Sequence, residues 1–153
     1  MSLYLGIDPG SSSGAVCVLS NDLNNPYPPF EFGKGTLNDF HKYLLQMSSK
    51  ELVYCVVEKV NIHPGTAVKS ASSFMKNCGN IEMALVCHNI PYKLETPGKW
   101  MKHFGMKKDK NETKTEWKKR LRALAEARLP VKIKATTADA YLLALYCKET
   151  FNK

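Results

Sequence analysis

The feature that most constrains the fold is the unbroken apolar run at residues 52–57, which is followed directly by Glu58. A strand with one solvated face alternates apolar and polar residues. A run without alternation, rich in β-branched residues, is typical of a strand buried on both faces. We therefore expect residues 52–57 to lie in the middle of a sheet that helices cover. A carboxylate at the end of such a strand is costly unless it is paired or bound to a metal.

Further strands are predicted around this one. Residues 3–8 form an apolar run that ends at Asp8, and residues 15–19 form a second run. The segment between them is rich in Pro, Gly and Ser, which indicates a turn and hence an antiparallel hairpin. We expect residues 30–35 to form a third strand, at an edge, and residues 92–96 to form a short last strand.

Helical spacing of apolar residues follows in several segments. Thr36 and Asp39 have the spacing of a helix cap before one such stripe, and Phe74 to Leu85 gives another. Pro97 opens a helical turn around Trp100. The remaining predictions are a basic helix at residues 115–128 and a final helix capped by Thr136 or Thr137.

Together these predictions give one α/β domain over residues 1–153, in the order β-β-β-α-β-α-β-α-α. We expect a mixed sheet, antiparallel in its first three strands and parallel afterwards, with helices on both faces. The content of 44% hydrophobic and 24% charged residues is ordinary for a soluble domain. No apolar run approaches the ~20 residues of a membrane span, and the N-terminus does not resemble a signal peptide. We therefore expect a cytoplasmic protein without a membrane partner.

The cysteines do not suggest a metal or disulfide framework. There are five of them, scattered and without a Cys-x-x-Cys pair. Reduced, mostly buried thiols are the expected state, and a zinc site is not expected.

The net charge of +8 is concentrated in one part of the chain. Residues 99–122 alone net +7. Such a block favours a polyanion, because neutralising phosphates releases counterions. The alternative is a solvated helix face. If the partner is nucleic acid, the candidate contacts in this block are Lys99, Lys102, Lys107, Lys108, Lys114 and Lys118.

Three acids stand out by their placement. Asp8 and Glu58 each end a predicted strand, and Asp139 lies in the first turn of the last helix. Converging carboxylates repel one another unless a cation lies among them, and Mg²⁺ or Mn²⁺ prefers oxygen ligands. Two such ions can promote hydrolysis of a phosphodiester. The alternatives are that Asp139 merely caps its helix, that Glu58 pairs with a lysine, and that Asp8 belongs to an ordinary turn.

The same residues resemble the motifs of a known family. Residues 6–11 followed by Gly14, residues 57–60, and residues 137–140 resemble the three acidic motifs of the RuvC-type Holliday junction resolvases, in the same order. The segments Glu58–Gly65 and Ile90–Trp100 are closer to the shorter phage and prophage branch. The resemblance covers nearly the whole chain.

The resemblance implies an RNase H-like fold and a homodimer in which each subunit nicks one strand of a four-way DNA junction. Asp8, Glu58 and Asp139 would be catalytic and would hold Mg²⁺, or Mn²⁺ in its place, with two ions in each site. No small-molecule cofactor is implied. Lys102 and Lys114 fall where the family has basic residues near the scissile phosphate, so Lys114 is a further catalytic candidate. Additional DNA-binding candidates lie in the second motif and directly after it: Lys59, Asn61 and His63.

Two positions depart from the family pattern. A fourth acid or a histidine commonly precedes the last aspartate by about one helical turn, and Thr136 stands there. Asp109 or Glu112 is a conceivable substitute. An aromatic residue commonly follows the glutamate motif, and Asn61 stands at its place, which leaves Ile62 or His63 as candidates for opening the junction. The apolar stripe of the helix around residues 74–85 is our hypothesis for the dimer surface.

Three other functions remain to be weighed. An RNase H-like nuclease that processes structured RNA would share the acids. A catalytically weak junction-binding module would share the fold and the basic block. An actin-like ATPase or sugar kinase has a similar phosphate loop, but it needs two such domains, for which 153 residues are too few.

Overall fold

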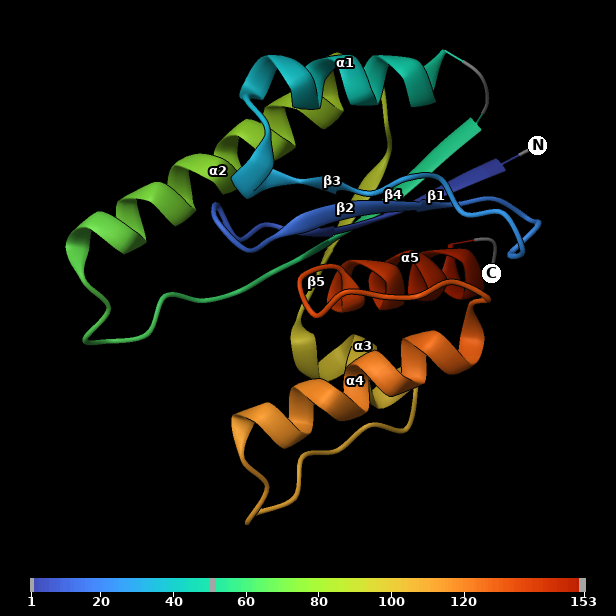
Figure 1. Cartoon of the computed structure of the whole chain (residues 1–153). Helices are drawn as coiled ribbons and strands as arrows, with labels where there is room; N and C mark the ends of the chain where they lie inside the picture. The colour runs from blue at the N-terminus through green and yellow to red at the C-terminus, as the bar shows by residue number, and fades with distance from the viewer. Residues whose placement is uncertain (1, 50–51, 152–153) are drawn as a thin grey trace.

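A five-stranded mixed sheet forms the centre of the computed structural model, which describes residues 2–49 and 52–151 (Figure 1). The strands lie in the order β3-β2-β1-β4-β5. β1 pairs antiparallel with β2 and parallel with β4, β2 pairs antiparallel with β3, and β4 pairs parallel with β5. This is the predicted mixed sheet. The strands are β1 (Ser2–Asp8), β2 (Ala15–Leu19), β3 (Phe30–Glu31), β4 (Leu52–Glu58) and β5 (Tyr92–Glu95).

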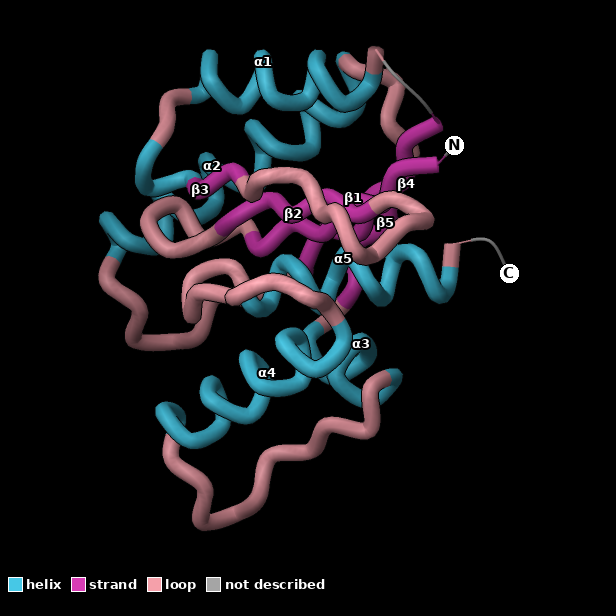
Figure 2. Tube along the Cα trace, turned by 45° about the vertical axis from the view of Figure 1, so that its right-hand side comes forward, coloured by secondary structure: helices cyan, strands magenta, loops and turns pink. Residues whose placement is uncertain are grey.

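Helices cover the sheet on both faces, as predicted. In Figures 1 and 2, α1 and α2 lie on one side of the sheet, and α5 lies on the other with α3 and α4 beyond it. The helices are α1 (Leu37–Ser48), α2 (Val68–Cys87), α3 (Pro97–His103), α4 (Lys114–Arg128) and α5 (Ala138–Thr150), and a 3-10 helix spans Phe32–Lys34. In the described part of the chain, no helix has the length and apolar character needed to cross a membrane.

The run at residues 52–57 is a central strand, with β1 on one side and β5 on the other. Its side chains enter two separate cores. Cys55 and Val57 pack in the core under α1 and α2, whereas Val56 packs in the core under α5. Burial on both faces explains why this strand shows no alternation of apolar and polar residues.

Some local predictions need correction. The third strand is limited to Phe30–Glu31, because the chain then turns into a 3-10 helix. This turn packs Phe32 against Phe40, with their ring centroids 5.3 Å apart. Thr36 and Asp39 do form a reciprocal capping box. Thr137 occupies the N-cap position of α5 but does not cap it with its side chain, because its hydroxyl donates to the Lys134 carbonyl instead. The last part of the chain contains three helices after β5, where the predicted order had two.

Part of the apolar stripe that suggested a dimer surface on the helix around residues 74–85 packs inside the subunit. Ile81 and Leu85 are buried against the protein's own sheet, as expected for an amphipathic helix that covers a core. The exposed apolar residues of α2 lie on another face, namely Val68, Met75, Met83 and Val86.

Candidate active site

Asp8 and Glu58 end the two central strands of the sheet. β1 and β4 are parallel neighbours, and their pairing runs to Ile7 opposite Val57. Each acid is the next residue of its strand, so both stand at the same edge. Alternation along the strands turns both acids towards the face covered by α5.

Helix α5 approaches this edge closely because β1 carries a glycine there. A Cβ atom at Gly6 would lie 2.2 Å from the Ala140 carbonyl oxygen and 2.2 Å from the Ala144 amide nitrogen. No side chain fits between the strand and the helix at that point. The contact places the first turn of α5, with Asp139, beside the end of β1.

The turn after Asp8 is tightly packed. The Gly10 amide donates to Asp8 Oδ1 at 3.3 Å, and the Gly14 amide donates to the Gly10 carbonyl at 2.8 Å. A Cβ atom at Gly14 would lie 2.2 Å from the Asp8 carbonyl oxygen. From the other face of the sheet, the side-chain amide of Asn77 in α2 donates from Nδ2 to the Pro9 carbonyl at 2.7 Å. These contacts fix the backbone that presents the Asp8 carboxylate.

Burial and neighbouring negative charge make two of the carboxyls weaker acids than usual. Burial, and secondly the charge of Asp139, raise the pKa of Asp8 to about 6. Burial, and secondly the charge of Asp8, raise the pKa of Glu58 to about 7. Two neighbouring carboxyls whose pKa values are raised, first by burial and secondly by nearby negative charge, are typical of a functional site.

Asp139 is 7% exposed and has one polar partner among the residues that the structure describes. Its Oδ2 accepts from the Lys118 ammonium of α4 at 2.5 Å, and its Oδ1 is buried without a hydrogen bond. Burial by itself lowers the pKa of Lys118, but the Asp139 carboxylate outweighs this and the net pKa is raised. Lys118 thus acts as the local counter-cation of the site.

Glu58 is 9% exposed, and the partner of its carboxylate is an indole. Trp100 Nε1 of α3 donates to Glu58 Oε2 at 2.8 Å. Within residues 2–49 and 52–151, the structure has no ion pair between Glu58 and a lysine. The alternative in which Glu58 pairs with a lysine is therefore wrong, and so is the one in which Asp139 only caps its helix.

The donor set suits a divalent cation, because it consists of carboxylate oxygens that repel one another and includes a buried acceptor without a donor. The side chains are not closed around a common point. In the described segments, no group of three His, Cys, Asp or Glu side chains is already gathered closely enough to hold a metal. Coordination by all three acids would require them to draw together, and Asp139 Oδ1 is the oxygen left without a hydrogen bond.

Thr136, which stands where the family pattern has a fourth acid, binds Glu31 and not the three acids of the site. Thr136 donates to Glu31 Oε1 at 2.9 Å, and Lys34 and Lys134 also contact that carboxylate. The conceivable substitutes are engaged elsewhere, since Glu112 accepts from Arg120 at 2.9 Å and Asp109 lies 4.0 Å from the same guanidinium.

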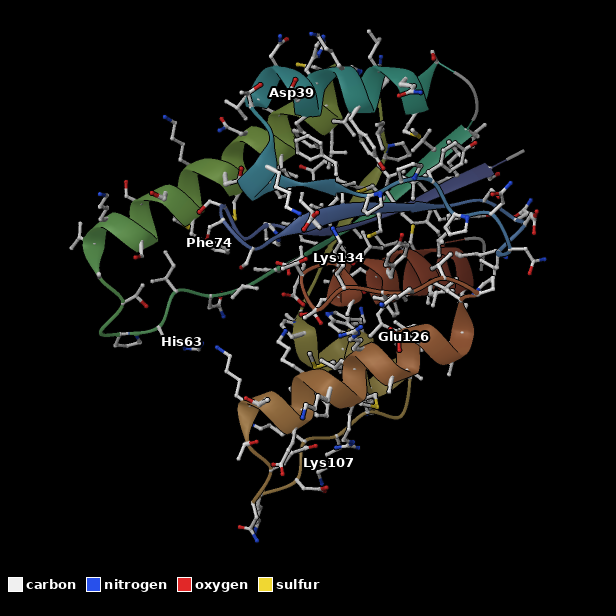
Figure 3. All side chains as sticks on the ribbon, viewed as in Figure 1. Asp39, His63, Phe74, Lys107, Glu126 and Lys134 are labelled. Carbon is white, nitrogen blue, oxygen red and sulfur yellow. The ribbon has the colours of Figure 1, made fainter. Side chains whose placement is uncertain are left out.

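The predicted basic and polar contact residues lie on three exposed segments. Lys59, Asn61 and His63 follow β4, where Figure 3 shows His63 on the loop before α2. Lys102, Lys107 and Lys108 line a hollow of about 630 Å³ between α3 and the loop before α4. Lys99 pairs with Glu95 at 3.1 Å. Lys114 is the exposed first residue of α4, one turn before Lys118.

Sequence reasoning missed two contacts of the acids. Lys118 was predicted as a DNA contact, and the structure brings it to Asp139. Its position one residue after the buried Trp117 was a usable signal, because it places Lys118 on the flank of the buried stripe. For the bond from Trp100 to Glu58 the sequence contains no signal, because 42 residues separate the partners.

Comparison with known proteins gives two results. No protein-family model matches the sequence, and no curated protein sequence is similar to it. Among solved structures, the chain resembles T. thermophilus RuvC in complex with a Holliday junction substrate, with a TM-score of 0.65 and 15% identity over 98% of this chain and 97% of the other. The fold is that of RuvC. A second structure, Thermus thermophilus RuvC, gives a TM-score of 0.63 and 16% identity over 94% and 91% of the two chains.

The RuvC likeness confirms the predicted mixed α/β fold and the predicted resemblance at the level of the fold. At these identities it concerns the backbone alone. What the side chains do is argued below from their own contacts.

Proposed function

We propose that the protein is a structure-specific DNA endonuclease that resolves four-way or other branched DNA junctions by metal-dependent phosphodiester hydrolysis. One observation is central to this proposal. Acids from β1, β4 and α5 lie at one edge of a RuvC-like sheet, where burial and neighbouring negative charge raise the pKa values of Asp8 and Glu58. The similar T. thermophilus structure contains a Holliday junction substrate, which favours a branched DNA as the substrate class.

Asp8, Glu58 and Asp139 would hold Mg²⁺, or Mn²⁺ in its place, and two ions would fit the chemistry. When bound, such ions activate water and stabilise the leaving oxygen of a phosphodiester. The chain itself supplies the anionic cradle, excludes bulk water by burying the carboxylates, and orients Asp8 through the Gly10 amide. Thr136 leaves one ligand fewer than the family pattern, so we expect one of the two ions to bind more weakly.

Lys118 is the lysine best placed to act at this site, and Lys114 remains a candidate one turn away. In the metal-free protein the Lys118 ammonium balances Asp139. Its side chain is 44% exposed, so it has room to turn towards a phosphate when a metal takes its place. A lysine that moves from a carboxylate to the scissile phosphate would offset the charge that develops there.

The DNA would lie along the basic segments beside the acids. α4 begins at the end of the molecule where the acids lie, and Lys118 joins this helix to them. Contacts from α4 and its preceding loop are expected to go to phosphates, which favours binding without strong sequence preference.

We also propose a homodimer with one active site in each subunit. The exposed apolar side chains of α2 are spaced along one side of the helix, with Gly79 among them and no atom near the place of its missing Cβ. A glycine inside a helix is costly, but it allows another helix to approach closely. Next to this helix lies a hollow of about 420 Å³ whose lining includes Val60, Ile62 and Leu94.

The test is cleavage of a synthetic four-way DNA junction in Mg²⁺ and in Mn²⁺, with linear duplex DNA and structured RNA as parallel substrates. The proposal expects paired, symmetric nicks in the junction alone. Cleavage restricted to RNA would move the function to an RNA-processing nuclease. Tight junction binding without cleavage in either metal would indicate a junction-binding module. This is the second candidate function, and it is favoured by the bond between Lys118 and Asp139 and by the absence of a fourth acid.

A further inference from the structure

Helix α3 sends one fully buried side chain, Trp100, to the end of β4. The indole is 0% exposed and donates from Nε1 to Glu58 Oε2 at 2.8 Å. The carboxylate that receives this bond is itself 9% exposed. A bond between two buried groups is shielded from competing water, so it persists and defines the orientation of both partners.

The chemistry of an indole suits the positioning of a metal ligand. An indole N–H is a donor with no acceptor capacity. It therefore occupies one carboxylate oxygen without competing for a cation, and it leaves Glu58 Oε1 available to a ligand. A lysine at the same place would contribute a full positive charge and repel the cation.

Helix α3 is fixed to α5 at both of its ends. Near its start, Lys99 pairs with Glu95 at 3.1 Å, and that carboxylate accepts from the Tyr146 hydroxyl of α5 at 2.6 Å. At its end, His103 lies 2.6 Å from Glu149 of α5. Arg128 of α4 binds the same Glu149 carboxylate.

These contacts connect the orientation of one acid to the helix that holds another. α5 carries Asp139 in its first turn and is anchored to α3 through its second half, while α3 orients Glu58 through Trp100. The relative placement of the two carboxylates thus depends on the docking of α3, although α3 contributes no acid to the site.

We propose that Trp100 is a positioning residue of the active site, which holds Glu58 in the rotamer that presents Oε1 to a divalent cation. The inference rests on the proposed function, because it concerns the same acids. It goes further in assigning a role to a helix outside the three acidic motifs.

The first test detects the hydrogen bond itself and needs no nuclease activity. The chain has two tryptophans, so a ¹⁵N-labelled sample gives two indole N–H signals, with Trp117 as the internal reference. We expect slow hydrogen exchange for Trp100 and a large displacement of its signal in Glu58→Ala, with Trp117 unmoved. An unchanged Trp100 signal in Glu58→Ala would overturn the proposal.

The second test removes the N–H and keeps the shape of the ring. Site-specific incorporation of 3-benzothienylalanine at position 100 replaces the N–H by sulfur, and Trp117→Phe is the matched control in the same core. We expect Mn²⁺ affinity, measured from the electron paramagnetic resonance of free Mn²⁺, to fall about 10- to 100-fold, as is usual when a partner behind a metal ligand is lost. This readout is independent of cleavage.

Kinetics separate positioning from a purely structural role. With the sulfur analogue we expect kcat to fall by a similar factor, while the Kd for the junction and the melting temperature stay close to those of the wild type. Unchanged Mn²⁺ affinity, or an equal loss in Trp117→Phe, would overturn the proposal. If the wild type binds Mn²⁺ as expected but cuts no substrate, the proposed function fails while the role of Trp100 is still decided by the metal affinity.

Discussion

Asp8 and Glu58 are acids that the fold makes difficult to ionise. In water each would be charged near neutral pH. Burial, and secondly a neighbouring negative charge, raise the pKa of Asp8 to about 6 and that of Glu58 to about 7. At neutral pH the buried carboxylates therefore destabilise the metal-free protein, and a bound cation would remove this destabilisation.

The first prediction concerns stability without metal. An acid whose pKa is higher in the folded than in the unfolded chain binds more protons when folded, so stability falls as pH rises between the two values. For Asp8 and Glu58 this window runs from about 4 to about 7. In EDTA, the melting temperature of the wild type should fall across this window.

Asp8→Asn should flatten this pH dependence and stabilise the metal-free protein at pH 8 by about 2 kcal/mol, because a pKa shift of about two units is worth about that much after partial relaxation. Mg²⁺ should raise the melting temperature of the wild type at pH 8 and have less effect on the variant. Calorimetry checks both statements. A variant that melts below the wild type at pH 8 would show that the Asp8 charge is well compensated in the metal-free fold.

The second prediction separates Lys118 from the surrounding basic residues. Lys118→Met leaves the buried Asp139 carboxylate without its cation, so the metal-free protein should lose about 1–3 kcal/mol of stability. Junction cleavage should fall at least about tenfold, as for the loss of a charged group that acts in the transition state. The neighbouring exposed Lys119 is the matched control. Equal effects of Lys118→Met and Lys119→Met in cleavage and denaturation assays would contradict the assignment.

At the scale of elements, much of the fold could be predicted because local patterns express it. The apolar run at residues 52–57 indicated a central strand, and the Thr36–Asp39 spacing indicated a helix start. Both are present in the structure. The acids were identifiable because an acid that ends a buried run is unusual on physical grounds.

Other features depend on tertiary contacts that no local pattern records. β3 stops after two residues because the chain turns there and packs the ring of Phe32 against that of Phe40. The sequence placed Trp100 in a helical turn but gave no sign of its hydrogen bond to Glu58, because 42 residues separate the two partners. Lys118 looked like one lysine in a basic block, because its acidic partner lies on another helix.

The third prediction tests the close approach of α5 to β1. Gly6→Ala adds a methyl group at a point where backbone atoms of α5 would lie 2.2 Å away. The helix must move, so we expect a loss of about 2–4 kcal/mol of stability, in the range of severe overpacking. Denaturant unfolding measures it. Gly98→Ala is the matched control, because nothing lies within 4 Å of its added Cβ. A Gly6→Ala protein as stable as Gly98→Ala would contradict this packing.

At the scale of the whole molecule, the site, the basic helix and the proposed dimer helix surround the same end of the sheet. Asn77 of α2 binds the loop after Asp8, while Lys118 of α4 binds Asp139. The acids thus lie between α2, the proposed dimer element, and α4, the proposed DNA-binding element.

The fourth prediction concerns assembly. Met83 is 62% exposed on the apolar side of α2, so Met83→Glu should bury a charge in the proposed interface and convert dimers to monomers at micromolar concentration. Leu45→Glu, on the exposed face of α1, is the control and should leave the mass unchanged. Light scattering after gel filtration gives the masses. A monomeric wild type would contradict the dimer.

The most direct test of the central claim is the cleavage of a four-way junction by the wild type and by Asp8→Asn in Mg²⁺, with binding measured in parallel. Asparagine keeps the shape of the side chain and removes its charge. The account predicts that cleavage falls by orders of magnitude while the Kd for the junction changes little, because phosphate contacts from the basic segments provide most of the affinity. Normal cleavage by Asp8→Asn would show that the acids at this edge of the sheet are not the catalytic site.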